Sequence, residues 1–293
     1  MDYNASLANA LMHLSQKVDK NNNRFDSAIC VPFLKWAGGK RWLVAEHASL
    51  FPSLYRTYFE PFLGSGASYF HLRPSQAVIS DANPDLINTY QALKSEWKQV
   101  ADRLNIHHQK HCKEHYYEIR SQAFDNPIEK AAQFIYLNRT CWNGLYRVNL
   151  KGKFNVPIGT KTKVVLDTDD FEQISSLLQR ADIKNEDFES VIDLAGKGDF
   201  IFVDPPYTVK HNLNGFVKYN EKLFSWEDQV RLRDCVRAAI KRGTKVLVTN
   251  ADHEDVRDLY KGMGSMRSLD RSSVISGSKA ARGKYSELVV KCF

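Results

Sequence analysis

Short apolar runs of strand length recur along the chain, separated by longer stretches whose apolar residues are spaced as on one face of a helix. The runs predict strands. One begins at Tyr58, one ends near Phe188, and the others occupy 77–80, 199–204, 245–250 and 288–293. The helical stretches are 67–72, much of 84–138, and a segment from the capping residue Ser225 to about Lys241. The segment 58–81 therefore has the strand, glycine turn, helix and strand order of a nucleotide-type βαβ unit.

The strand at 199–204 ends in a carboxylate that is followed at once by two prolines and an aromatic ring, Asp204-Pro205-Pro206-Tyr207. Proline cannot continue a parallel ladder, so the strand must stop at Asp204. The carboxylate and the ring are thereby delivered to the carboxyl end of a strand, where open α/β sheets bind their ligands. Because the prolines also leave backbone carbonyls without ladder partners, the turn suits a flat base that carries an exocyclic amino group.

A glycine turn and a second strand-end carboxylate indicate a nucleotide-type ligand beside that site. Gly64 and Gly66 let the backbone pass close to a ligand, because neither residue carries a Cβ atom. Asp81 lies seventeen residues after Gly64, at the spacing where an acidic residue holds ribose hydroxyls. Tyr69 stands where a dinucleotide-binding fold would normally have its third glycine, which disfavours a nicotinamide oxidoreductase.

A Gly-Gly pair at 38–39 precedes an amphipathic stretch and predicts a loop that opens a helix. Backbone amides at such a helix start favour a carboxylate or a phosphate. Lys35 and Lys40 add positive charge to this loop, although lysines beside a surface turn are also common without any ligand.

The stretch from Asn138 to Pro157 alternates apolar and polar residues around glycines and predicts a β-hairpin at about 139–158. Six basic residues and no acidic one lie between Arg139 and Lys163, interleaved with aromatic side chains. A two-stranded ribbon fits the major groove of DNA, where arginine is the commonest reader of guanine, and aromatic rings can stack on bases. The alternative is an exposed basic hairpin without a specific partner.

Composition narrows the class of protein. The chain has 293 residues, of which 43% are hydrophobic, and its formal net charge of +7 favours a polyanionic partner. The five cysteines are scattered and form no CxxC pair, so we expect neither disulfides nor a cysteine zinc site. The sequence lacks a long apolar run and a secretory signal, which predicts a cytoplasmic protein.

Several polar segments are expected to lie outside the chemistry. His107, His111 and His115 have a four-residue spacing that could hold a metal, but their polar surroundings favour a solvated helix face and no metal. Residues 1–30 predict a peripheral arm with a short helical pattern. A polar loop is predicted at 210–222, and a basic loop at 271–284 before the final strand.

Three motifs, in this order, resemble those of the Dam-type family of DNA adenine N6-methyltransferases. They are Lys35-Trp36-Ala37-Gly38-Gly39-Lys40, Glu60-Pro61-Phe62-Leu63-Gly64-Ser65-Gly66 and Asp204-Pro205-Pro206-Tyr207. The segments 143–147 and 154–157 also resemble the recognition hairpin of that family, and the likeness covers residues 31–293. The resemblance implies an α/β fold with a seven-stranded, mostly parallel Rossmann-like methyltransferase sheet that has one antiparallel strand. It also implies an inserted helical and β-hairpin region for DNA recognition.

The resemblance assigns a role to each matching position. The residues that would bind S-adenosylmethionine are Trp36, Ala37, Lys40, Phe62, Gly64, Gly66, Asp81, Asp187, Phe188 and Asp204. Asp81 would hold the ribose hydroxyls, whereas Asp187 and Phe188 would contact the adenine of the cofactor. The residues that would carry catalysis are Asp204, Pro205, Pro206 and Tyr207. The residues that would contact double-stranded DNA are Lys35, Arg139, Trp142, Asn143, Leu145, Arg147, Lys151 and Lys153, with Trp142 entering the base stack and Arg147 reading a guanine.

These expectations divide the chain into an arm at 1–30, a catalytic domain at 31–90 and 164–293, and a target-recognition region at 91–163. GATC is the expected target, although Gly159-Thr160-Lys161-Thr162-Lys163 replaces the Gly-Arg-Tyr-Lys that the family often has after its hairpin, so a recognition arginine is absent there. We expect a monomer that works without a metal. In a bacterial or phage setting it would associate with the nucleoid.

In this hypothesis the target adenine is flipped out of the duplex, at a cost of a few kcal/mol, and stacks on Tyr207. Its amino group would donate to the Asp204 carboxylate and the Pro205 carbonyl, and Asp204 would stabilise the positive charge that develops on the nitrogen. One alternative is methylation of another exocyclic amino group, in RNA adenine or cytosine, and a second is a non-catalytic DNA-binding module. The aspartate before Pro-Pro-Tyr and the predicted hairpin favour adenine in duplex DNA.

Overall fold

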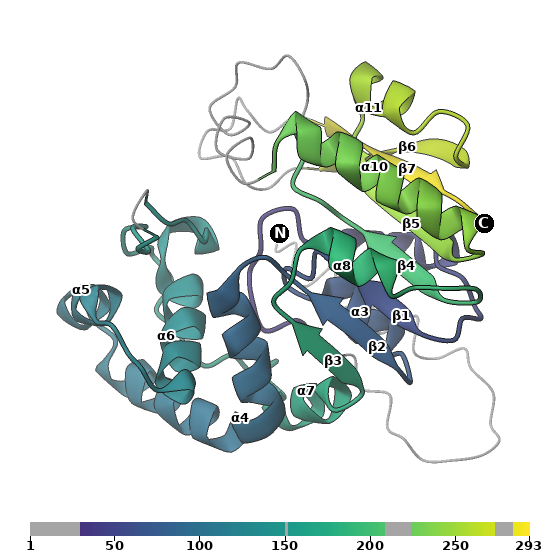
Figure 1. Ribbon diagram of the computed structural model, residues 1–293. Coiled ribbons are helices and arrows are strands. Elements are labelled where there is room, and N and C mark those ends of the chain that lie inside the picture. The colour runs from purple at the N-terminus through teal and green to yellow at the C-terminus, as the bar shows by residue number, and fades with distance from the viewer. Residues whose placement is uncertain (1–29, 150–151, 209–223, 273–283) are drawn as a thin grey trace.

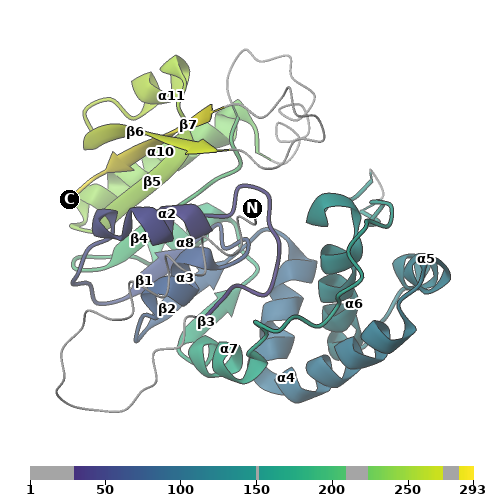
Figure 2. The same ribbon diagram turned by 180° about the vertical axis from the view of Figure 1, so that it is seen from behind.

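The computed structural model describes residues 30–149, 152–208, 224–272 and 284–293. Within them, one sheet is flanked by helices on both faces, and a lobe of three helices lies at one side of the sheet (Figures 1 and 2). Most of the predicted arm, the predicted loop at 210–222, most of the predicted loop at 271–284 and Lys151 lie outside the described residues. No helix in the described part of the chain is long and apolar enough to cross a membrane.

Seven strands form the sheet, in the order β3-β2-β1-β4-β5-β7-β6. They are β1 (Tyr58–Glu60), β2 (Ala77–Ser80), β3 (Ala181–Lys184), β4 (Phe200–Val203), β5 (Lys245–Ala251), β6 (Ser265–Ser272) and β7 (Lys284–Lys291). β1 to β5 pair in parallel, whereas β7 runs antiparallel to both of its neighbours. The chain winds in opposite directions from β1 and β4, so these two strands flank a topological switch point.

The expected seven-stranded α/β sheet is confirmed, but it is mixed rather than mostly parallel, because two of its six strand pairings are antiparallel. Strand β6 is absent from the sequence-based prediction, which placed a loop at 271–284 and began the last strand at Leu288. The reason is that β6 is an edge strand whose only large apolar residues, Met266 and Leu269, are half-buried. It therefore has no apolar run to reveal it.

The helices surround the sheet and build the lobe. They are α2 (Arg41–Glu46), α3 (Ala67–Leu72), α4 (Pro84–Lys110), α5 (Lys113–Ser121), α6 (Pro127–Thr140), α7 (Phe171–Leu178), α8 (Phe188–Asp193), α10 (Trp226–Lys241) and α11 (Glu254–Leu259), with the 3-10 turns η1 (Ala48–Leu50) and η2 (Trp142–Gly144). The start of α10 is confirmed, since Ser225 and Asp228 form a reciprocal capping box. In the lobe, α4 and α6 both begin with an asparagine cap followed by proline.

Two hydrophobic cores lie on opposite faces of the sheet, because side chains alternate along each strand. In β4, Phe200 and Phe202 join the core that α2, α3, α4, α6 and α7 share, whereas Ile201 and Val203 join the core under α8, α10 and α11. All four side chains are buried. The lobe therefore shares a continuous core with one face of the sheet and is not a separately packed unit.

The predicted hairpin at 139–158 is wrong at its start. Residues 139 and 140 complete the last turn of α6, and η2 follows directly. Beyond them the described residues of this segment form two isolated antiparallel bridges, Cys141 with Ile158 and Val148 with Phe154. The polar end of α6 is buried because its side chains have partners in the fold, such as the Thr140 hydroxyl that donates to the Tyr136 carbonyl.

The expectation of a solvated histidine face on α4 is also wrong. His107 is 6% exposed and stacks on Tyr136 with ring centroids 4.9 Å apart, and its Nδ1 lies 3.1 Å from Nε2 of His115. Burial, together with the nearby His115, lowers the pKa of His107 to about 4. Among the described residues no group of three or more histidine, cysteine or acidic side chains is arranged to hold a metal ion.

Acidification should destabilise the lobe through His107. The ordinary pKa of this group is 6.5 and the folded value is about 4, so between these values the unfolded chain binds a proton that the folded chain excludes. The contribution of His107 is complete above about pH 6.5 and is lost as the pH falls toward 4. Between pH 7.5 and 5.0 the free energy of unfolding, measured with urea, should fall by about 1–2 kcal/mol more in the wild type than in His107→Gln.

The control for this comparison is His253→Gln, which removes a histidine that is 44% exposed. This variant should keep the pH dependence of the wild type. Equal pH dependence in wild type and His107→Gln would assign the acid sensitivity to other groups.

Candidate active site

The carboxyl ends of β1 to β4 bring most of the predicted cofactor and catalytic residues to one edge of the sheet. The glycine turn follows β1, Asp81 follows β2, Asp187 comes shortly after β3, and Asp204 follows β4 directly. Because the four strands are parallel neighbours, these side chains lie along the same edge of the sheet, on either side of the switch point between β1 and β4. The stop at Asp204 has the expected cause, since Pro205 and Pro206 cannot extend the ladder.

Asp204 is held through one carboxylate oxygen. Oδ1 lies 2.8 Å from Nζ of Lys40 and accepts a hydrogen bond of 2.7 Å from Oγ1 of Thr249. Oδ2 makes no hydrogen bond to the residues that the structure describes, and neither does the Pro205 carbonyl. Burial raises the pKa of Asp204, and the charge of Lys40 opposes this rise. The site therefore presents a fixed carboxylate with one oxygen available to a substrate.

Tyr207 is anchored by Glu287, a residue that the sequence analysis missed. The Tyr207 hydroxyl donates to Oε2 of Glu287 at 2.8 Å. The same oxygen lies 3.5 Å from Nζ of Lys40, which in turn lies 5.0 Å from the centre of the Tyr207 ring. The only sequence signal was a single carboxylate at the start of the buried apolar run 288–290.

The glycine turn requires glycine because of backbone conformation and of Trp36. Gly64 and Gly66 have φ values of +50° and +66°, and a Cβ atom on Gly64 would lie 2.7 Å from the Trp36 indole. The Gly64 amide donates to Oδ2 of Asp81 at 3.0 Å, and the Asn83 amide donates to Oδ1 at the same distance. The turn and the strand-end carboxylate are thus built as one unit, and burial raises the pKa of Asp81.

The loop before α2 joins the sheet edge to the lobe. The Trp36 ring stacks on Tyr146 with centroids 5.7 Å apart. The side chain of Asn138 accepts from the Lys35 amide at 2.9 Å and donates to the Lys35 carbonyl at 2.8 Å. This pair of hydrogen bonds holds the Lys35 backbone while its side chain, like that of Ala37, stays exposed.

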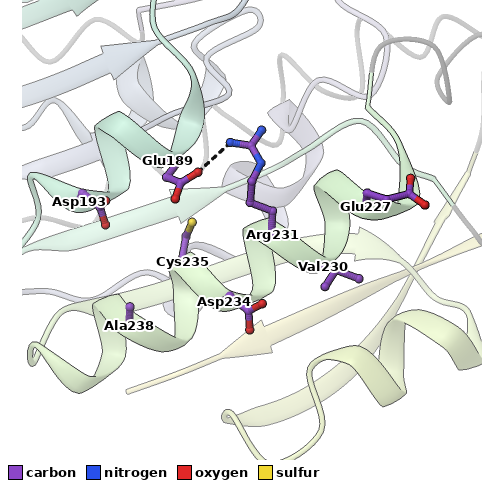
Figure 3. A pocket seen from close by; sticks show the side chains of 8 residues that line it. All are labelled: Glu189, Asp193, Glu227, Val230, Arg231, Asp234, Cys235 and Ala238. Atoms are coloured by element: carbon purple, nitrogen blue, oxygen red, sulfur yellow. Dashed lines mark hydrogen bonds and ion pairs between the residues drawn. The ribbon is translucent and has the colours of Figure 1, made fainter.

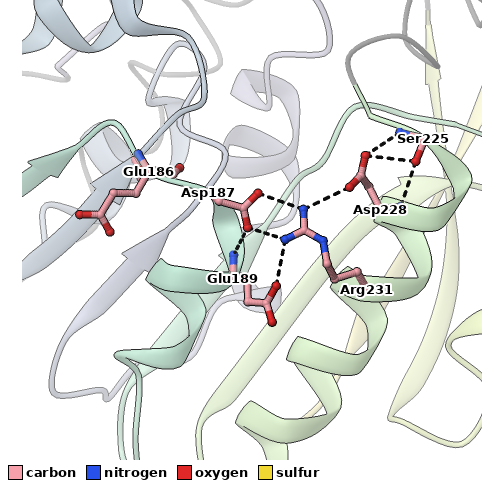
Figure 4. A network of polar contacts seen from close by, with 7 residues as sticks. Glu186, Asp187, Glu189, Ser225, Asp228 and Arg231 are labelled. Carbon is pink, nitrogen blue, oxygen red and sulfur yellow. Dashed lines mark hydrogen bonds and ion pairs between the residues drawn. The ribbon is translucent and has the colours of Figure 1, made fainter.

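Asp187 belongs to a polar network centred on Arg231 of α10 (Figure 4). The Arg231 guanidinium contacts both oxygens of Asp187, at 2.6 and 2.9 Å, and also Glu189 and Asp228. It lies 4.1 Å from the centre of the Phe188 ring, which stacks on Phe62 at 5.5 Å. Hydrogen bonds from Arg231 lower the pKa of Asp187. No pattern in the sequence indicates Arg231 as part of the site.

A cleft of about 450 Å³ adjoins this network between α8 and α10 (Figure 3). Four carboxylates, Arg231, Cys235 and two small apolar side chains line it. The Arg231 guanidinium contacts the Glu189 carboxylate across it. None of the predicted site residues lines the cleft, so it is separate from the Asp204 site.

The predicted DNA contacts fall into two groups. Trp142 is 51% exposed on η2, where Asn143 adopts a φ of +57°, and Arg147 and Lys153 are exposed while Leu145 is half-buried. Arg139, by contrast, is 1% exposed, so its assignment as a DNA contact is wrong. Its guanidinium meets both oxygens of Asp169 at 2.6 Å and donates to two backbone carbonyls, those of Phe33 and Val164.

Comparison with known proteins agrees with this geometry. The family model described as D12 class N6 adenine-specific DNA methyltransferase matches residues 36–274. The chain is 38% identical over 268 residues to "Type II methyltransferase M1.LlaDCHI" of Lactococcus lactis subsp. cremoris, with 88% of this chain and 94% of the relative covered. It is 33% identical to "Type II methyltransferase M.MjaIII" of Methanocaldococcus jannaschii, with 88% and 98% covered, and 34% identical to "DNA adenine methylase" of Vibrio cholerae, with 88% and 94% covered.

The buried pair of Arg139 and Asp169 should be essential to the fold. Arg139→Ala leaves the Asp169 carboxylate buried without its partner, so we expect the free energy of unfolding to fall by about 3–5 kcal/mol. Arg147→Ala is the matched control, because it removes an exposed arginine from the neighbouring segment and should change that free energy by less than about 0.5 kcal/mol. If urea denaturation gave the same loss in the free energy of unfolding for both variants, the burial of Arg139 would not make it more important to stability than Arg147.

Proposed function

The chain belongs to the D12 class of N6 adenine-specific DNA methyltransferases, and from this membership we propose that its reaction takes place at the Asp204–Tyr207 turn with S-adenosylmethionine as the methyl donor. The observation that carries the proposal is the state of Asp204. Its carboxylate is buried at a strand end, with Oδ1 fixed by Lys40 and Thr249 and Oδ2 directed to no described residue. A carboxylate that is fixed in this way can accept a hydrogen bond from an amino group at one defined position.

The amino nitrogen of adenine is a poor nucleophile, because its lone pair is delocalised into the ring. When the Asp204 carboxylate and the Pro205 carbonyl each accept one of its protons, a pyramidal nitrogen with an available lone pair is favoured. The negative charge of Asp204 then stabilises the positive charge that develops on the nitrogen. Lys40 and Thr249 keep the carboxylate in place without occupying Oδ2.

The donor set at the sheet edge fits S-adenosylmethionine, which supplies an electrophilic methyl group when it is bound. Each Asp81 oxygen accepts one backbone amide and retains acceptor capacity for the ribose hydroxyls. Asp187 offers an acceptor and the stacked rings of Phe62 and Phe188 an apolar face for the adenine. The residues that the family resemblance assigns to the methionine end are Trp36, Ala37, Lys40, Phe62, Gly64 and Gly66.

Residues 91–163 form the proposed target-recognition region, with 31–90 and 164–293 as the proposed catalytic domain. The exposed Trp142 would fill the gap that the flipped adenine leaves, and Arg147 would read a guanine. The Arg147 Nε donates to Oδ1 of Asn155 at 2.9 Å, which leaves the rest of the guanidinium for a base or phosphate. GATC is the proposed target, on the strength of the family resemblance alone.

Asp204→Ala should abolish methyl transfer and preserve cofactor binding. With labelled S-adenosylmethionine and unmethylated duplex DNA, the rate should fall by roughly 10³-fold, because the charge on the nitrogen loses its acceptor. Calorimetry should show a dissociation constant for S-adenosylmethionine within about threefold of the wild type. Mapping of the modified bases in the wild-type reaction should find N6-methyladenine. An active alanine variant would contradict the proposed role of Asp204.

Arg231→Met should weaken S-adenosylmethionine binding by about tenfold, because Asp187 loses the bidentate partner that orients its carboxylate. The maximal rate at saturating cofactor should change little, since Arg231 does not contact Asp204. Arg237→Met is the matched control, because Arg237 lies on the same helix and is 49% exposed. Equal cofactor affinity in the two variants would remove Arg231 from the cofactor site.

A further inference from the structure

Glu287 is a buried carboxylate in the last strand. It lies in β7 and is 3% exposed, and the three residues that follow it are buried and apolar. The family model ends at residue 274, so this position lies outside the segment that defines the family match. Burial of a carboxylate is costly unless it is paired, and the partners of Glu287 are therefore informative.

Two partners of Glu287 among the described residues belong to the Asp204 site. Oε2 of Glu287 accepts from the Tyr207 hydroxyl at 2.8 Å and lies 3.5 Å from Nζ of Lys40. Lys40 itself is 3% exposed and lies 2.8 Å from Oδ1 of Asp204. A single oxygen from β7 thus reaches the ring and the lysine that flank the reacting carboxylate.

We propose that Glu287 is a positioning residue for methyl transfer. It fixes the Tyr207 ring, and it weakens the electrostatic attraction between Lys40 and Asp204. The inference rests on the proposed function of the Asp204–Tyr207 turn. The hydrogen bond at the hydroxyl sets where the ring plane lies, and the ring plane sets where a stacked base presents its amino group.

The charge of Glu287 acts on Lys40 independently of the Tyr207 ring. Lys40 faces two carboxylates, Asp204 and Glu287, so the three groups together carry a net negative charge when all are ionised. If Glu287 were neutral, Lys40 would pair with Asp204 alone and would offset more of the negative charge of Asp204. That negative charge is what stabilises the positive charge that develops on the amino nitrogen. Glu60 at the end of β1 is close enough to Asp204 to interact with it electrostatically, and burial raises the pKa of Glu60, which favours its neutral form.

The test is a double-mutant cycle of Glu287→Gln and Tyr207→Phe, with kcat for duplex DNA and the dissociation constant for S-adenosylmethionine as readouts. Glu287→Gln should lower kcat by about tenfold or more and leave cofactor affinity within about twofold of the wild type. Tyr207→Phe removes the donor of the hydrogen bond, and Glu287→Gln replaces its charged acceptor by a neutral amide. Because both variants act on the same hydrogen bond, the double variant should be no slower than about the slower single variant. Asp270→Asn, which removes an exposed carboxylate from β6, is the matched control and should keep wild-type kcat.

Two results would overturn the inference: a kcat of Glu287→Gln within twofold of the wild type, or losses that multiply in the double variant. A purely structural role would lower the unfolding temperature and the cofactor affinity together, without coupling to Tyr207. If Glu287→Gln does not fold, Tyr207→Phe alone decides, since an unchanged kcat there refutes a role for the hydrogen bond. Failure of the wild type to methylate DNA would refute the proposed function. An active wild type together with an unchanged kcat in Glu287→Gln would refute only this inference.

Discussion

A buried lysine is the constraint on which the site depends. An ammonium group that is 3% exposed must be paired, and Lys40 is paired with two carboxylates and with the Gly38 carbonyl. These carboxylates belong to Asp204 after β4 and Glu287 in β7, so the lysine draws together the first described loop, a central strand and the last strand. Removal of Lys40 would take from both buried carboxylates the ammonium group with which they pair, whereas removal of either carboxylate would leave Lys40 paired with the other.

The same loop connects the catalytic edge to the helical lobe. Asn138 binds both backbone groups of Lys35, and Trp36 stacks on Tyr146, so one short segment is fixed by residues at the end of α6 and just beyond it. On the sheet side, the Trp36 indole fills the space that a side chain at Gly64 would need. Trp36 therefore contacts both the segment that carries the proposed DNA contacts and the glycine turn of the proposed cofactor site.

Local rules predicted the elements that local sequence determines. Prolines end β4 at Asp204, the capping serine starts α10, and 67–72 and 77–80 form the predicted helix and strand. The errors concern polar residues whose partners are distant in sequence. Arg139 meets Asp169 thirty residues later, and Glu287 meets Tyr207 eighty residues earlier. A polar residue in isolation has the same appearance whether it faces water or a buried partner, so no periodicity distinguishes the two.

The mixed character of the sheet gives β7 its role. In a parallel strand only the last residues would reach the carboxyl edge, where Asp204 lies. Because β7 is antiparallel, its early residues lie there instead, and the register pairs Glu287 with Ala251 at the very end of β5. Alternation along the strand then sends Val289 into one core and Leu288 and Val290 into the other. One reversed strand thus completes both cores and delivers a carboxylate to the reacting edge, which a seventh parallel strand could not do with the same residues.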